Sequence, residues 1–329
     1  MVDIPSNHLS KNSLGGTELM LHRLYSSLPE DLLKEFQIIP TRLTDSLDET
    51  KIRIAWIHDL VGDPSLDYLK NGGWKKFHLI VFVSNNQMQS FINSYNIPWS
   101  RCLVIENAII PIENVDFNKS KDKIKLIYTP TPHRGLSILI NAFPKLLEEF
   151  PNLELDVFSS FNLYGWGERD KEYEKLFDIC REHPQINYHG TQSNEVVREA
   201  LRQSHIFTYP SIWQETSSLC LIEAMSAGLL CVHSNLGALY ETSANWTFQY
   251  QYNENVELHT MGFIQAMKAA INNFTHDKMV TNRLMSQKNY IDQIHNWDYK
   301  KVQWEGLLRQ LVSLPRGFPK EDLIINYRT

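Results

Sequence analysis

This sequence of 329 residues has few cysteines and none at the close spacing of a redox or zinc motif. The four cysteines are scattered along the chain and form no CxxC pair: Cys102, Cys180, Cys220 and Cys231. The histidines also fall at none of the spacings that hold structural zinc. We therefore expect reduced thiols, no disulfide framework and no metal site, as is usual for a cytoplasmic protein.

Long hydrophobic runs and an excess of positive charge are missing as well. Apolar runs such as residues 79–83 are far too short to cross a bilayer, and the first residues show neither the basic nor the apolar part of a signal peptide. The formal net charge of -6 does not favour binding to nucleic acid through its phosphates, so we expect no nucleic-acid partner. The chain is 43% hydrophobic, which is enough to build two cores.

Short apolar runs alternate with longer amphipathic stretches along the chain. The apolar runs predict strands at 52–57, 79–83, 103–105, 125–128, 153–158, 205–209 and 229–233. Helical spacing predicts helices at 17–27, 136–150, 168–181, 194–203, 219–227 and 261–274. Alternation of this kind builds parallel sheets with helices on both faces, so we predict an α/β fold.

A polar stretch from residue 111 to residue 123 predicts a domain boundary, because it contains Pro111 and a charged run and separates two strand–helix series. We expect a small N-terminal domain over residues 1–112 and a larger domain over 113–296. The tail, 297–329, is expected to form a helix that stops near Pro315. Its predicted apolar face comprises Val302, Trp304, Leu307, Leu308 and Leu311.

Residues 209–228 carry two carboxylates in a strand–loop–helix setting. Glu215 lies in the loop, the helix begins near Ser218, and Glu223 lies inside that helix. Ligands of parallel sheets bind beyond the carboxyl ends of the strands, where helix N-termini offer free N–H groups to anions. Ionised glutamates accept hydrogen bonds from hydroxyls, so a ligand with hydroxyls and a diphosphate would suit this segment.

The alternative for these glutamates is that Glu215 caps a helix and Glu223 is solvated. Against it, the neighbours of Glu223 are mostly apolar, and a buried carboxylate without a partner is costly.

The segment resembles the signature of retaining glycosyltransferases of family 4. The resemblance rests on Pro210, Ser211, Glu215, Glu223, Ala224, Met225 and Gly228, followed by Val232 and Glu241. It covers residues 124–245 well and the N-terminal region more weakly. It implies the GT-B architecture, two Rossmann-like domains with parallel sheets that face each other across a cleft. It also implies that the tail packs back on the N-terminal domain.

The resemblance assigns roles to the residues around the two glutamates. It implies that Glu215 binds the hydroxyls of the donor sugar and that Glu223 binds the ribose hydroxyls. It also implies that the amides of Ser218 and Leu219 contact the diphosphate. Thr216 and Ser217 precede them, in the loop where further backbone amides could meet a phosphate. Ser218 stands where the family more often has glycine.

Arg134 follows the strand at 125–128 and precedes a helix. The resemblance implies that its guanidinium neutralises the leaving diphosphate, which arginine can bind through two hydrogen bonds. The family usually supplies a second cation directly after this strand, but residues 129–132 contain no arginine. Whether His133 replaces that cation is open.

Two further elements lie in the N-terminal region. Gly15 and Gly16 precede a helix, and the resemblance implies that this loop faces the diphosphate. Only fourteen residues precede Gly15, so the strand before the loop is expected to be short or missing. His58 follows the strand at 52–57, and the resemblance assigns it to the sugar site.

The resemblance implies transfer of a sugar from a nucleoside diphosphate sugar to an acceptor hydroxyl, with retention of configuration and without a metal or other cofactor. The acceptor is expected to be a glycan, a lipid-linked molecule or a small molecule. Membrane contact is expected to be peripheral at most, through residues 74–78, for which a solvated helix face is the alternative. A GT-B epimerase or phosphorylase, and a non-catalytic sugar-nucleotide or glycan-binding protein, remain open.

Overall fold

The computed structural model describes residues 15–317 and 319, and the chain divides into two compact units. Among the described residues, the N-terminal unit comprises 15–108 together with 297–317 and 319. The C-terminal unit comprises Ile109–Asn296. The N-terminal unit is therefore built from two segments that are far apart in the sequence.

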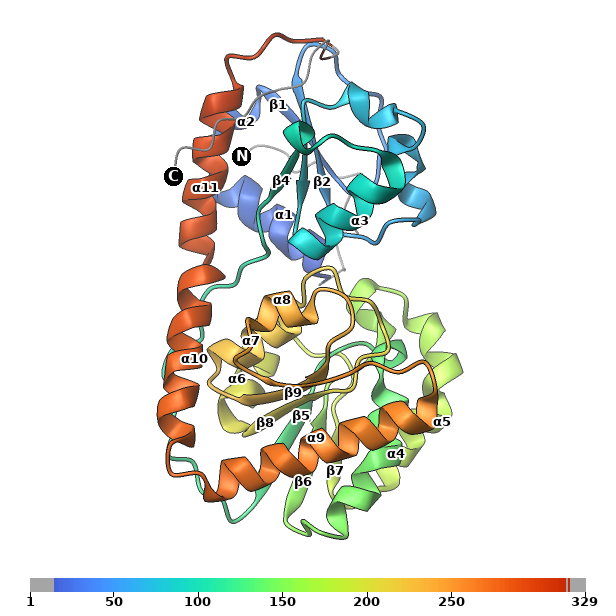
Figure 1. Cartoon of the computed structure of the whole chain (residues 1–329), viewed down its shortest axis with the longest axis vertical. Helices are drawn as coiled ribbons and strands as arrows, with labels where there is room; N and C mark the ends of the chain where they lie inside the picture. The colour runs from blue at the N-terminus through green and yellow to red at the C-terminus, as the bar shows by residue number, and fades with distance from the viewer. Residues whose placement is uncertain (1–14, 318, 320–329) are drawn as a thin grey trace. The chain divides into compact units, whose positions relative to one another are not determined.

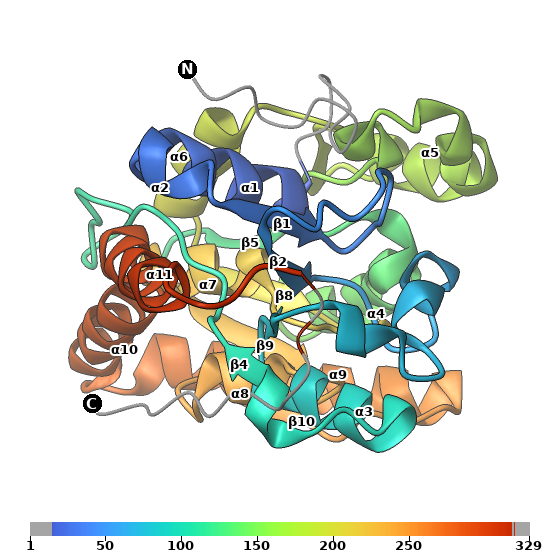
Figure 2. The same cartoon turned by 90° about the horizontal axis from the view of Figure 1, so that it is seen from above.

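The N-terminal unit contains a four-stranded parallel sheet in the order β1-β2-β3-β4. Its strands are β1 (Phe36–Pro40), β2 (Ile52–Ile57), β3 (Leu79–Phe82) and β4 (Cys102–Val104). The helices are α1 (Gly16–Ser27), α2 (Glu30–Leu33), α3 (Asn85–Tyr95) and α11 (Trp297–Leu311), with short 3-10 turns η1 (Pro64–Leu69), η2 (Gly73–Lys76) and η3 (Trp99–Arg101). Helices α1 and α11 lie on one side of the sheet and α3 on the other (Figures 1 and 2). Both central strands are buried on both faces, as their mostly apolar sequences indicate.

The C-terminal unit contains a six-stranded parallel sheet in the order β10-β9-β8-β5-β6-β7. Its strands are β5 (Ile124–Tyr128), β6 (Leu153–Val157), β7 (Ile186–Tyr188), β8 (Ile206–Tyr209), β9 (Leu230–Ser234) and β10 (Phe248–Tyr250). The longer helices are α4 (Leu136–Leu147), α5 (Glu174–Glu182), α6 (Asn194–Gln203), α7 (Leu219–Ser226), α9 (Val256–His276) and α10 (Val280–Ile294), and α8 (Leu239–Ser243) is short. Helices α4 and α9 cover one face of the sheet, and α6 and α7 cover the other (Figure 2).

The strand order reverses between β5 and β8, which pair through Leu126 with Ile206 and Ile127 with Phe207. From β5 the sheet grows toward β7, and from β8 it grows toward β10. Such a switch point leaves room at the carboxyl ends of the two strands, where ligands of open α/β sheets bind. The loops after β5 and β8 are therefore neighbours in space, although they are about eighty residues apart in sequence.

The predicted α/β fold with two parallel sheets is confirmed, with differences in detail. All seven predicted strands are present to within a residue or two, but β1, β7 and β10 were not predicted. β7 and β10 have three residues each, too few to show alternation, and β1 is an edge strand that ends at Pro40. The helix predicted over 168–181 starts as a 3-10 stretch, Gly167–Tyr173. Helices α3 and α10 were also missed.

The tail forms α11, which belongs to the N-terminal unit. Trp304 is fully buried, and its ring meets that of Trp56 on β2 edge-on at 4.7 Å between centroids. The ammonium of Lys300 pairs with Glu106. The prediction for Val302 was wrong, since this side chain is 68% exposed; two positions before Trp304, it lies on the outer face of the helix.

Candidate active site

The loops that follow β5 and β8 touch each other at the carboxyl edge of the larger sheet. Gly135, at the start of α4, has a φ of 133°, which side chains rarely adopt. A Cβ atom at this position would lie 2.2 Å from the carbonyl oxygen of Pro210. Only glycine permits so close an approach of the two backbones, and the approach brings Arg134 beside the loop that carries Glu215.

Arg134 and Glu215 form a buried ion pair. The Arg134 Nη1 atom lies 2.5 Å from Glu215 Oε1, and the hydroxyl of Tyr209 donates to the same carboxylate oxygen. Burial lowers the pKa of Arg134, but the facing carboxylate, with Tyr164 and Tyr209 nearby, more than offsets it and leaves that pKa well above its ordinary value. The guanidinium is therefore a permanent positive charge at this edge of the sheet.

Helix α7 points its N-terminus at the same edge. Ser218 is the N-cap, and its hydroxyl accepts a hydrogen bond from the amide of Leu221. The first amides of a helix have no acceptor within the helix, so those of Leu219 and Cys220 remain for an anion. The loop that precedes α7 is held by a backbone hydrogen bond, in which the Ala238 amide donates to the Glu215 carbonyl at 2.8 Å. The first turn of α7 therefore offers backbone N–H donors next to a loop that is tied to the rest of the unit.

Buried polar atoms without hydrogen-bond partners gather in these two loops. Within the described residues, Thr131 Oγ1, His133 Nδ1, Arg134 Nε and Ser217 Oγ are buried and unpaired. An unpaired buried donor or acceptor costs about 1–3 kcal/mol, so native proteins tolerate few of them outside functional sites. Their concentration beside Arg134 and Glu215 favours a polar ligand here.

Glu223 lies on α7 and is 7% exposed, as its apolar neighbours indicated. Its Oε1 atom accepts from the side-chain amide of Asn194 at 3.1 Å and lies 3.4 Å from Nη1 of Arg198. Arg198 also donates to the carbonyls of Ile110 and Pro111. The sequence did not single out Asn194 or Arg198. In the sequence, both residues belong to the polar side of α6. That pattern does not indicate that this side of the helix contacts α7.

An aromatic cluster borders the arginine. The ring of His133 stacks on Phe161 at 5.0 Å and meets the edge of Trp213 at 4.9 Å, while the Arg134 guanidinium lies 5.8 Å from the Trp213 ring. Burial, followed by the charges of Arg134 and Arg169, lowers the pKa of His133 to about 4. His133 is therefore neutral near pH 7.

The residues predicted in the N-terminal unit occupy the ends of its elements. Gly15 is the N-cap of α1 and Gly16 its first residue, while the expectation of a short or missing strand before them falls on residues 1–14, outside the described residues. His58 follows β2 and packs against Trp56 at 4.6 Å between ring centroids. Burial lowers the pKa of His58 to about 3, so this imidazole is also neutral at pH 7.

The cluster predicted at 74–78 forms η2 and the turn after it. Trp74 is buried and Lys75 lies over its ring at 5.6 Å, which agrees with a solvated turn over a buried tryptophan.

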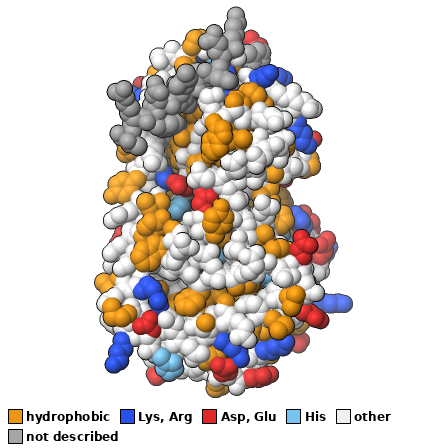
Figure 3. Space-filling view, viewed as in Figure 1, with side chains coloured by type: hydrophobic (Ala, Val, Ile, Leu, Met, Phe, Trp, Pro, Cys, Tyr) orange, Lys and Arg blue, Asp and Glu red, His pale blue; other side chains and the backbone are white. Residues whose placement is uncertain are grey.

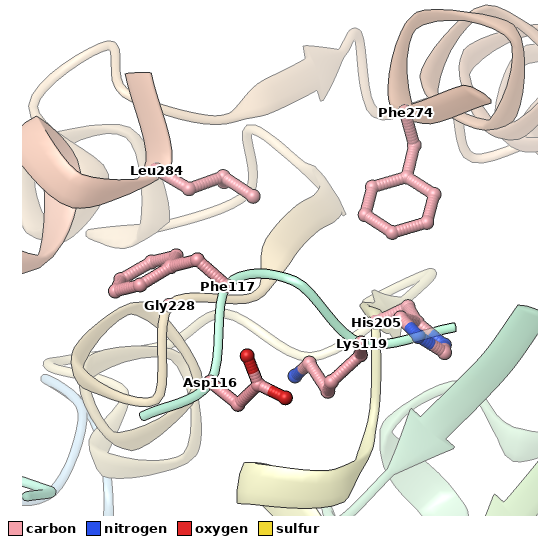
Figure 4. Close-up of a pocket in the computed structure, with 7 residues that line it drawn as sticks. All are labelled: Asp116, Phe117, Lys119, His205, Gly228, Phe274 and Leu284. Carbon is pink, nitrogen blue, oxygen red and sulfur yellow. The ribbon is translucent and has the colours of Figure 1, made fainter. Parts of the chain in front are cut away.

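A small cavity lies near the other end of β8 (Figure 4). It is lined by Asp116, Phe117, Lys119, His205, Gly228, Phe274 and Leu284. Its volume of about 10 Å³ is at the lower limit for holding a single water molecule. The Lys119 ammonium binds the carbonyls of Arg202 and Ser204, where it caps the C-terminal end of α6. We interpret this cavity as structural.

The structure also describes the cysteines and the groups that could hold a metal. All four cysteines are free thiols. Among residues 15–317, no group of three or more His, Cys, Asp or Glu side chains is arranged to hold a metal ion. Within the same range, no helix combines the length and the apolar character that a membrane span requires. Acidic and basic side chains are interspersed on the face shown in Figure 3.

Solved structures of glycosyltransferases share this architecture. A glycosyltransferase from Rickettsia africae superposes with a TM-score of 0.64 over 80% of this chain and 72% of that one, at 14% identity. HepE of Anabaena, solved in complex with UDP-glucose, gives 0.61 over 79% of this chain and 73% of that one, at 16% identity. At such identities the likeness concerns the fold, which is GT-B.

The sequence comparisons match part of the chain to a family of glycosyltransferases. Residues 126–273 match the family model described as Glycosyl transferases group 1. The GPI3 subunit of the phosphatidylinositol N-acetylglucosaminyltransferase of Saccharomyces cerevisiae is 22% identical over 245 residues, 71% of this chain and 50% of that protein. The phosphatidyl-myo-inositol mannosyltransferase of Mycolicibacterium smegmatis is 27% identical over 114 residues, 35% of this chain and 27% of that protein. The chain thus spans about half the length of the first of these relatives, and less of the second.

Proposed function

We propose that the chain transfers a sugar from a nucleoside diphosphate sugar to an acceptor hydroxyl, with retention of configuration and without a metal ion. One observation carries the proposal: the Arg134–Glu215 ion pair lies at the switch point of the larger sheet, in the loops that lead to α4 and α7. A cation, free helix amides and a carboxylate then share one edge of the sheet. Those groups suit a diphosphate joined to a hydroxyl-rich ring.

In this proposal each group has a chemical role. Arg134 and the amides of Leu219 and Cys220 stabilise the negative charge that develops on the leaving diphosphate. Glu215 accepts hydrogen bonds from the donor sugar, and Glu223 accepts them from the ribose. The bond between the anomeric carbon and the diphosphate oxygen breaks, and the acceptor oxygen forms the new bond. The leaving phosphate takes the proton of the acceptor hydroxyl.

The first acceptor to test is phosphatidylinositol. The names of two relatives contain phosphatidylinositol or phosphatidyl-myo-inositol. The chain covers half or less of the length of these relatives, so we propose phosphatidylinositol as the acceptor, with a glycan or a small molecule as the alternative.

A thermal-shift screen followed by a turnover assay tests the proposal. UDP-glucose, GDP-mannose and ADP-glucose, with their bare diphosphates, cover three nucleobases; a ligand that binds the folded chain raises its melting temperature. The bound donor is then incubated with phosphatidylinositol vesicles, and the anomeric configuration of the product is read by proton NMR. We expect a product that keeps the donor's configuration. Binding without any turnover would indicate a non-catalytic sugar-nucleotide protein, and donor conversion without an acceptor would indicate an epimerase.

Chelation provides an independent prediction. Because Arg134 and the helix amides supply the stabilising charge, we expect the initial rate of transfer to remain within twofold in excess EDTA. Loss of transfer on chelation, restored by manganese, would assign the reaction to a metal-dependent class.

A further inference from the structure

Tyr209 is the last residue of β8, a central strand flanked by β9 and β5. Its ring is fully buried and meets the ring of Tyr128 at 6.3 Å and that of Phe207 at 6.0 Å, both edge-on. A side chain held between a ring on the neighbouring strand β5 and a ring on its own strand has little freedom to change rotamer. The position of its hydroxyl next to the loop that carries Glu215 is therefore well defined.

The hydroxyl of Tyr209 donates to Oε1 of Glu215, the oxygen that also faces Arg134. Burial, followed by the charge of Glu215, raises the pKa of Tyr209 well above its ordinary value, so the phenol keeps its proton. Both donors meet the same oxygen, and within the described part of the chain Oε2 of Glu215 receives no hydrogen bond. One oxygen is thus held by the protein, while the other remains for a ligand.

We propose that Tyr209 is the positioning residue of the donor-sugar site: its hydroxyl holds Oε1 of Glu215 so that Oε2 is presented to the hydroxyls of the transferred sugar. The inference rests on the proposed function. Arg134 cannot by itself hold the carboxylate during turnover, because its guanidinium is also the expected partner of the diphosphate. Tyr209 has no such second partner among the described residues. It therefore keeps Glu215 in place when the arginine binds phosphate.

The chain offers a matched control for this role. Tyr128 on β5 is also fully buried, and its hydroxyl donates to the carbonyl of Thr131 at 3.0 Å. Tyr209→Phe and Tyr128→Phe each remove one buried hydroxyl from the last residue of a strand of the same sheet. Only the first removes a bond to Glu215. Circular dichroism and the melting temperature establish that both variants are folded.

The test compares the affinity of each protein for a sugar nucleotide with its affinity for the bare diphosphate. UDP-glucose and UDP, GDP-mannose and GDP, and ADP-glucose and ADP are titrated calorimetrically into the wild type, and the pair that binds best is used for the variants. In Tyr209→Phe we expect the affinity for the bare diphosphate to stay within twofold. The advantage of the sugar nucleotide, and kcat where turnover is measured, should fall roughly tenfold to a hundredfold, the usual effect of losing a hydrogen bond to a charged group.

Tyr128→Phe should match the wild type within twofold in both affinities. The inference is overturned if Tyr209→Phe keeps the wild-type sugar advantage, if it loses affinity for the bare diphosphate equally, or if Tyr128→Phe shows the same loss. Wild-type protein that binds none of the six nucleotides overturns the proposed function and this role with it. That outcome is read from the wild type alone, so the two failures are distinguishable.

Discussion

Glu223 is held by Asn194 and Arg198 of the neighbouring helix, and we assign its carboxylate to the ribose. We expect Glu223→Ala to weaken binding of the bare nucleoside diphosphate by about 1–3 kcal/mol, the range for charge-assisted hydrogen bonds. Isothermal calorimetry measures the change. Glu182→Ala, which removes an exposed glutamate at the end of α5, is the control and should bind like the wild type. Unchanged affinity in Glu223→Ala would show that this residue does not contact the nucleotide.

Two buried histidines make stability depend on pH. Burial lowers the pKa of His58 to about 3 and that of His233 to about 4, whereas an unfolded histidine titrates near 6.5. Between these values the unfolded chain binds protons that the folded chain does not, so stability rises with pH and is lost as pH falls below about 6.5. Each residue should remove about 2 kcal/mol between pH 7 and pH 5.

Urea denaturation at these two pH values measures the effect. His58→Gln should reduce the difference between them, whereas the exposed His276→Gln should leave it unchanged. A pH difference of wild-type size in His58→Gln would contradict the assignment.

Single residues of the site were predictable only where the chemistry is local. Glu215 and Glu223 stood out because the strand, loop and helix around them are contiguous in sequence. The ion pair of Glu215 with Arg134 joins residues 81 positions apart, and it exists because β5 pairs with β8. The sequence also did not predict a role for Tyr209, since a tyrosine at the end of a buried strand is ordinarily part of the core. Long-range side-chain partners require the order of the strands, which no local pattern contains.

Among the elements, α11 is the clearest test of how the N-terminal unit is stabilised. We expect Trp304→Ala to destabilise this unit by about 3–5 kcal/mol, because it leaves a cavity against Trp56. Val302→Ala on the exposed face of the same helix should change stability by less than about 0.5 kcal/mol. Chemical denaturation followed by tryptophan fluorescence measures both. Equal effects of the two substitutions would contradict the observed packing of the helix.

Elements were predictable in proportion to their length and periodicity. Helix α6 was predicted with its bounds, since its polar and apolar residues alternate at helical spacing. Helix α3 was missed, although a capping signal was present: Ser84 accepts from the Gln87 amide, and the Gln87 side chain accepts from the amide of Val83. In α10 the polar residues outnumber the apolar ones, and its buried face appears only once the helix is packed.

For the whole molecule, the family match and the candidate site fall in the same unit. Residues 126–273 lie inside the C-terminal unit, and so do Arg134, Glu215 and Glu223. The N-terminal unit carries Gly15, Gly16 and His58, whose roles rest on resemblance and remain predictions. Selection of the acceptor is expected in this unit, because the groups that we assign to the donor belong to the other one.

The most direct test of the central claim is a calorimetric titration of wild type and Glu215→Ala with the preferred sugar nucleotide and with its bare diphosphate. We assign the diphosphate to Arg134 and the α7 amides, and the sugar to Glu215. The wild type should therefore bind both ligands. Glu215→Ala should retain the affinity for the bare diphosphate within about threefold, and it should lose the contribution of the sugar together with turnover. If Glu215→Ala abolished binding of the bare diphosphate, or if the wild type bound neither ligand, the account of this site would be contradicted.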